Sequence, residues 1–102
     1  MITLNTAYYG EYRSSNNFNE FGKTVTFSAD IYTNYECSIR IYTYKNGYSQ
    51  SITYVPANTP GTYTVTRSIP DDIVHILYRV EPRSYTNNDA FCYTDNWRLT
   101  IL

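Results

Sequence analysis

The side chains that could bind a ligand lie at alternate positions in two segments of the chain. The polar positions of the first segment, Cys37 to Tyr44, hold Ser38, Arg40, Tyr42 and Tyr44. In the second, Ile73 to Glu81, the matching positions hold His75, Leu77, Arg79 and Glu81. Alternation with a period of two places such residues on one face of a strand. Tyrosine rings offer apolar faces and arginine offers directed hydrogen bonds, so this mixture suits a ligand with C–H patches and hydroxyl groups.

The segments that must position these residues also show the pattern of strands. In Thr24 to Tyr32, apolar Val25, Phe27, Ala29 and Ile31 alternate with polar residues, whereas runs with helical periodicity are nearly absent. Further strands are expected at Ile2–Tyr9, Tyr48–Val55, Thr62–Ile69 and in the terminal stretch from Phe91. Turn signals separate them, including the Asn-Gly pair in "KNGY", the Pro/Gly-rich "PANTPG" and the turn "PDD".

Seven or eight short strands with regularly spaced turns predict an all-β fold. Because nearly every strand alternates, each sheet should have one buried and one hydrated face, which favours an antiparallel two-sheet β-sandwich. With 102 residues, the chain is expected to form a single domain, residues 1–102.

Composition argues against several partners. The net charge is −1 and no basic run occurs, so nucleic acid and anionic membranes lack the electrostatic attraction they require. No segment approaches the roughly 20 apolar residues of a membrane span, and "MITLNTAYYG" does not have the pattern of a signal peptide. We therefore expect an extracellular or cell-surface domain in mature or excised form, or a phage virion protein.

The two cysteines, Cys37 and Cys92, do not have the spacing of a zinc site. If they pair, they close a long loop and stabilise the fold by about 3–4 kcal/mol. If they do not, each is a small buried hydrophobic residue. The sequence leaves both alternatives open.

Three stretches, taken in order, resemble jelly-roll carbohydrate-binding modules of the galactose-binding-domain-like type. They are "GKTVTFSADIYT" (residues 22–33), "GTYTVTRSIPDDIVHILYRVEP" (61–82) and "CYTDNWRLTIL" (92–102), and the match covers roughly residues 20 to 102. Such modules occur beside polysaccharide-active enzymes and in phage tail proteins. The resemblance implies a jelly-roll sandwich and a non-catalytic role in binding a polysaccharide or other glycan.

The resemblance also implies that the two Tyr/Arg-rich segments are neighbours in the sheet whose outer side binds the ligand. The candidate ligand-binding residues are then Arg40, Tyr42, Tyr44, Arg79 and Glu81, with Tyr54 and His75 at the margins. The alternative is that these side chains only stabilise an exposed sheet face through cross-strand pairs.

The remaining candidates carry simpler alternatives. In relatives a structural calcium lies near the first loop and the last-strand aspartate, here Asp95, but an Asx-type bond closing a bulge would equally explain this residue. Trp97 shares the parity of Leu99 and Ile101, which predicts a core residue rather than a stacking platform. Asp71 and His75 are too far apart along a strand for one metal site and fit a turn instead.

The sequence does not favour an enzyme, because its one histidine and scattered glutamates form no catalytic pattern. No cofactor is expected beyond the possible structural calcium. Besides glycan binding, two alternatives stay open: a structural or adhesion domain of a phage tail or cell surface, and a secreted inhibitor or toxin that binds protein through its tyrosines. The oligomeric state and the particular sugar are not specified by the sequence.

Overall fold

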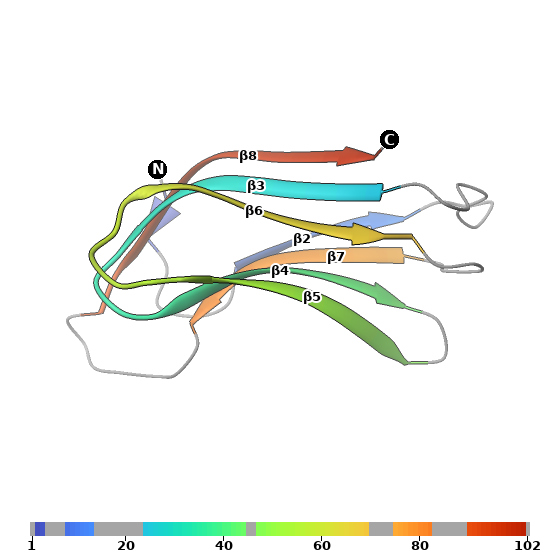
Figure 1. The fold of residues 1–102 in the computed structure, drawn as a ribbon, viewed down its shortest axis with the longest axis horizontal. Coiled ribbons are helices and arrows are strands. Elements are labelled where there is room, and N and C mark those ends of the chain that lie inside the picture. Colours follow the sequence, from blue (N-terminus) through green and yellow to red (C-terminus); the bar gives the residue numbers. More distant parts are fainter. Residues whose placement is uncertain are drawn as a thin grey trace.

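Two antiparallel β-sheets face each other in the computed structural model, which describes residues 2–3, 8–13, 24–44, 47–69, 75–82 and 90–101 (Figure 1). One sheet has the strand order β1-β8-β3-β6, and the other has the order β2-β7-β4-β5. We call them the β3 sheet and the β4 sheet, after a strand that lies inside each. The strands are β1 (Ile2–Thr3), β2 (Tyr8–Arg13), β3 (Thr24–Thr33), β4 (Cys37–Tyr44), β5 (Tyr48–Val55), β6 (Gly61–Ser68), β7 (His75–Pro82) and β8 (Cys92–Ile101).

The predicted all-β antiparallel sandwich is confirmed, and most strand bounds agree with the sequence pattern. β4 and β5 have the expected limits, β3 is one residue longer at its end, and β6 begins and ends one residue earlier than expected. The expected strand Ile2–Tyr9 is wrong, because two strands, β1 and β2, take its place and join different sheets. The predicted turn "PDD" lies outside the described residues.

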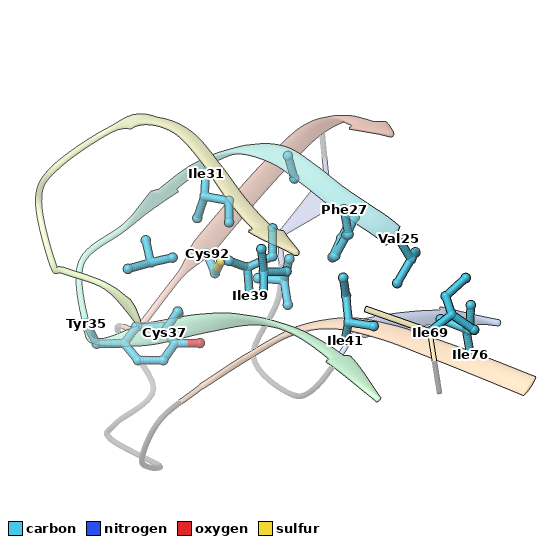
Figure 2. Close-up of a cluster of buried hydrophobic side chains, with 14 residues drawn as sticks. Val25, Phe27, Ile31, Tyr35, Cys37, Ile39, Ile41, Ile69, Ile76 and Cys92 are labelled. Carbon is cyan, nitrogen blue, oxygen red and sulfur yellow. The ribbon is translucent and has the colours of Figure 1, made fainter. Parts of the chain in front are cut away.

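The core lies between the sheets and consists of the alternating apolar residues of the inner strands. Val25, Phe27 and Ile31 of β3 point toward Ile39 and Ile41 of β4 (Figure 2). All five are at most 2% exposed. Burying one such side chain stabilises the fold by about 1.5–3 kcal/mol, so this alternation is sufficient to hold the two sheets face to face.

A β-bulge in β8 decides which residues of the last strand enter the core. Ser28 pairs with Arg98 and Asp30 with Asp95, so Ala29 alone faces both Asn96 and Trp97. Asn96 has a φ of 54°, a left-handed conformation that asparagine tolerates better than most residues. The extra residue shifts the alternation by one. Thr94 and Trp97 therefore both face inward, and Asp95 lies on the exposed side.

The two cysteines are neighbours across the sandwich, and both are free and buried. Cys37 belongs to β4 and Cys92 to β8, so the two thiols come from opposite sheets (Figure 2). A hydrogen bond from the Cys92 thiol lowers the pKa of Cys37 to about 7, helped by the Thr33 hydroxyl, whose Oγ1 lies 3.4 Å from the Cys37 sulfur. The same hydrogen bond and burial raise the pKa of Cys92, which keeps its proton.

Candidate functional site

The two Tyr/Arg-rich segments are paired antiparallel strands of the β4 sheet. β4 pairs with β7 in a register that sets Ser38 beside Glu81, Arg40 beside Arg79, and Tyr44 beside His75. On its other side β4 pairs with β5, with Tyr54 beside Ser38 and Tyr48 beside Tyr44. These residues alternate with the buried core residues Ile39 and Ile41 and therefore occupy the outer face of the sheet.

The centre of this outer face is a hydrogen-bonded network of Arg40, Tyr42, Arg79 and Glu81. Glu81 Oε1 lies 2.9 Å from Arg40 Nε in an ion pair and accepts a hydrogen bond from the Tyr42 hydroxyl at 3.2 Å, and Glu81 Oε2 lies 3.5 Å from Arg79 NH1. The Arg79 guanidinium carbon is 5.0 Å from the centroid of the Tyr42 ring, within reach of a cation–π interaction. Burial, followed by the charge of Glu81, raises the pKa of Tyr42, so its hydroxyl remains a donor.

Three members of this central network are too buried to present a broad surface to a ligand. Tyr42 is 6% exposed, and the side chains of Arg40 and Glu81 are 17% and 14% exposed. Arg40 also hydrogen-bonds Ser38 Oγ at 2.8 Å and Gln50 Oε1 at 3.2 Å. Their geometry fits cross-strand stabilisation of the sheet, the alternative to ligand binding that the sequence left open.

The accessible aromatic surface lies at one end of the face, in a row formed by Tyr48, Tyr44 and His75. Tyr44 stacks on the His75 ring with 4.1 Å between ring centroids, and its centroid lies 5.9 Å from that of Tyr48. Tyr48 is 61% exposed. Tyr48 also contacts Tyr42, with 5.4 Å between ring centroids. This ring row crosses three adjacent strands and presents several mutually supported rings together. Tyr48 was not a predicted site residue, although its alternation with Gln50 in β5 could have indicated it.

The other predicted site residues lie farther along the same face. Tyr54, at the opposite end of β5 from Tyr48, is 52% exposed. Arg79 is intermediate, with 32% of its side chain exposed, and lies between the ring row and the Tyr54 end. No structural observation tests whether any of these residues binds a ligand, so the predicted site remains a prediction.

Asp95 forms a local hydrogen bond beside the bulge, and Trp97 packs against the core as its parity predicted. Asp95 Oδ1 accepts a hydrogen bond from the Asn96 backbone at 2.9 Å, next to the bulge. Within the described ranges, no group of three or more His, Cys, Asp or Glu side chains could hold a metal ion. The proposed calcium stays a prediction, because the first loop lies outside those ranges. Trp97 packs against the core, with 5.0 Å between its ring centroid and that of Phe27.

The outer face of the β3 sheet contains a pocket that the sequence did not indicate. Near the start of β3 this face holds only the short polar side chains Thr24, Thr26 and Ser28. Farther along β3, Asp30 and Tyr32 line a pocket of about 240 Å³ together with residues of β6 and β8. The pattern of a single strand does not reveal this pocket, because it forms only where three strands lie side by side.

The comparisons with known proteins agree with this architecture. The fold is similar to that of a solved structure described as "Family 16 Carbohydrate Binding Module-2", with a TM-score of 0.65. Sequence identity is 17%, and the match covers 96% of this chain and 74% of that one. No family model and no curated protein matches the sequence. At this identity the likeness concerns the fold alone. No helix in the described residues is long and apolar enough to cross a membrane.

Proposed function

We propose that this protein is a non-catalytic carbohydrate-binding domain that holds a polysaccharide or glycan on the outer face of the β4 sheet. The observation that carries the proposal is the ring row, in which Tyr48, Tyr44 and His75 form a continuous aromatic surface across three strands. Sugar rings have C–H faces that pack on aromatic rings, and rings that support one another lose little conformational entropy on binding.

Polar groups next to the ring row would orient the bound sugar. Gln50 of β5 lies two residues along the strand from Tyr48 and pairs with Tyr42. Arg79 lies farther along β7, where it pairs with Arg40. Their amide and guanidinium groups can hydrogen-bond sugar hydroxyls beside the stacked ring. In this proposal, Arg40, Tyr42 and Glu81 fix the sheet beneath the ligand, and Tyr54 marks how far a longer chain could extend.

The strand order supports assignment to the jelly-roll type. Successive strands alternate between sheets from β1 to β4 and again from β5 to β8, giving the orders β1-β8-β3-β6 and β2-β7-β4-β5. Two such four-stranded sheets are the arrangement of a jelly roll, an architecture used by lectin domains among others. The structural likeness to a carbohydrate-binding module supports the same proposal. We propose an extracellular, cell-surface or virion setting for this role.

A glycan array, followed by calorimetric titration with the best binder, tests the proposal. Tyr48→Ala should weaken binding about tenfold or more, since it removes the most exposed ring of the row. Tyr48→Phe is the matched control, because it retains the ring and should bind nearly as well. Tyr54→Ala measures whether the ligand reaches the far end of the face.

Stability measurements separate loss of binding from loss of fold. Tyr48 is 61% exposed, so the melting temperature of Tyr48→Ala should stay close to that of the native protein. If native protein binds no glycan on the array, or Tyr48→Ala and Tyr44→Ala bind as tightly as native, the ring row is not a sugar site. The structural or adhesion alternative would then be favoured.

A further inference from the structure

The pocket on the outer face of the β3 sheet lies on the opposite side of the sandwich from the ring row. It is formed where β6, β3 and β8 run side by side, near the end of the sheet at which β3 and β8 bend toward the other sheet (Figure 1). Its volume of about 240 Å³ is below the roughly 300–1,000 Å³ of sites for drug-sized ligands. The pocket therefore suits one small ring rather than an extended chain.

The lining of the pocket consists of two parallel rows with different chemistry. One row holds three polar groups on adjacent strands: Thr62 of β6, Asp30 of β3 and Asp95 of β8, which are in register with one another. The other row holds Tyr32 and Tyr93, paired across β3 and β8, and Pro60 just before β6. The rows are two residues apart along β3, about 7 Å. A ligand would meet acceptor groups on one edge and apolar rings on the other.

The rings of the pocket are held in place from one side by Phe91. The Phe91 ring centroid lies 5.3 Å from that of Tyr32 and 4.8 Å from that of Tyr93. Phe91 is itself fixed, because its backbone N–H donates to Asn34 Oδ1 at 2.8 Å. Tyr32 nevertheless remains 43% exposed, so its ring is both positioned and accessible.

The acceptor at the centre of the polar row is fixed as well. Asp30 Oδ1 accepts from the Thr62 hydroxyl at 2.6 Å, and Asp30 Oδ2 accepts from Asn96 Nδ2 at 2.7 Å. These hydrogen bonds, that of Thr62 first, lower the pKa of Asp30 below its usual 3.8, which keeps it ionised at neutral pH. Each carboxylate oxygen has a second lone pair with which it can accept from a ligand hydroxyl.

We propose that this pocket is a second glycan-binding site, which takes a single neutral pyranose ring with its hydroxyls on Asp30 and Asp95 and its C–H face against Tyr32 and Tyr93. Two hydroxyl groups on adjacent carbons of a sugar can both donate hydrogen bonds to the oxygens of one carboxylate. A site with fixed carboxylates beside aromatic rings can therefore bind the hydroxyl groups of a sugar and pack against its C–H face. The choice of a sugar as occupant rests on the proposed function, whereas the pocket itself does not depend on the ring row. With sites on both sheets, one domain could contact two chains of a polysaccharide.

Nuclear magnetic resonance titration of the whole chain tests the proposal. The probes are the methyl glycosides of glucose, mannose and galactose, with glucosamine and n-butylammonium as cationic comparisons. With at least one neutral glycoside we expect shifts of the backbone amides of Tyr32, Thr62 and Tyr93. Tyr32→Ala and Asp30→Asn should each weaken this binding about tenfold or more, since hydrogen bonds to charged groups and buried ring contacts have effects of this size.

Matched variants distinguish the pocket from the ring row. Tyr48→Ala changes the other sheet and should leave the pocket shifts intact, while Tyr32→Phe retains the ring and should bind nearly as native. If Asp30→Asn melts well below the native protein, Tyr32→Ala alone decides the result, because its exposed ring contributes little to the core.

Two outcomes would overturn the proposal. One is that no neutral glycoside shifts the pocket amides at any concentration, even where the ring row responds, in which case the proposed function stands without the second site. The other is that only glucosamine and n-butylammonium shift them, with affinity that falls as salt is added, which would define a site for cations. Failure at the ring row alone would leave the pocket proposal standing.

Discussion

Replacing Glu81 should destabilise the fold without abolishing the glycan binding proposed for the ring row. Glu81 is the hub of the central network, since its carboxylate contacts Arg40, Tyr42 and Arg79. Exposed ion pairs contribute about 0–1 kcal/mol, whereas breaking a buried pair costs about 3–5 kcal/mol. The Arg40 and Glu81 side chains are 17% and 14% exposed, between these limits. We therefore expect Glu81→Ala to lower the free energy of unfolding by about 2–3 kcal/mol.

Urea denaturation of a small set of variants measures this effect. Tyr42→Phe removes only the hydroxyl donor and should cost about 1 kcal/mol, the usual net value of one hydrogen bond. The two substitutions together should cost less than their sum, because they remove the same contact. Glu36→Gln, at an exposed position between β3 and β4, is the matched control and should change stability by less than about 0.5 kcal/mol.

The reasoning is refuted if Glu81→Ala costs less than about 0.5 kcal/mol, since the network would then contribute no more than an exposed pair. It is also refuted if Glu81→Gln abolishes glycan binding while the free energy of unfolding is unchanged, since this substitution retains the volume of the side chain and one acceptor oxygen. Glu81 would then be a ligand contact, as the sequence suggested, rather than a support for the sheet.

Four further predictions concern the core, the thiols and the pocket. Phe27→Ala should lower the free energy of unfolding by about 3–5 kcal/mol in urea denaturation, because Phe27 is fully buried and contacts Trp97 and Tyr78; a cost below about 1 kcal/mol would contradict the core described here. Oxidation by a small-molecule disulfide should join Cys37 to Cys92 with the loss of two hydrogen masses per chain and a higher melting temperature, whereas Cys92→Ala should show neither change. Under reducing conditions, the pKa of Cys37 is about 7 in the native protein and has its ordinary value of 9 in the unfolded chain. Between these two pH values the unfolded chain holds more protons than the native one, so the free energy of unfolding should rise with pH there and flatten or fall above pH 9. Cys92→Ala removes the thiol that lowers the pKa of Cys37 and should abolish the rise. The contribution of Asp30 to the proposed sugar binding is the difference in affinity between the native protein and Asp30→Asn, followed by the Tyr32 amide shift. It should persist from neutral pH down to the ordinary carboxyl value of 3.8, because the pKa of Asp30 is lower still; its loss near neutral pH would show that Asp30 is not an acceptor.

The outer faces show where strand-by-strand reasoning stops. Alternation correctly assigned Arg40, Tyr42, Arg79 and Glu81 to one face, and the register of β4 with β7 brings them together. It did not show that three of them are enclosed by their own contacts, because burial on an outer face depends on side chains from neighbouring strands. For the same reason the pocket at Asp30 and Tyr32 was missed, since its other walls come from β6 and β8.

The sequence by itself determined the class of fold, since period-two alternation with turn signals leaves few alternatives to an antiparallel sandwich. Local patterns determined the limits of β4 and β5, which form a hairpin containing Gly47 at a φ of 112°. Only the tertiary structure decided the parity of the last strand. Simple alternation gives Asp95 and Trp97 the same side, but the bulge at Asn96 turns Asp95 outward into the pocket and Trp97 inward onto Phe27. A bulge is stabilised by the partner strand, here through Asp30 and Asn96, and that contact joins residues far apart in the sequence.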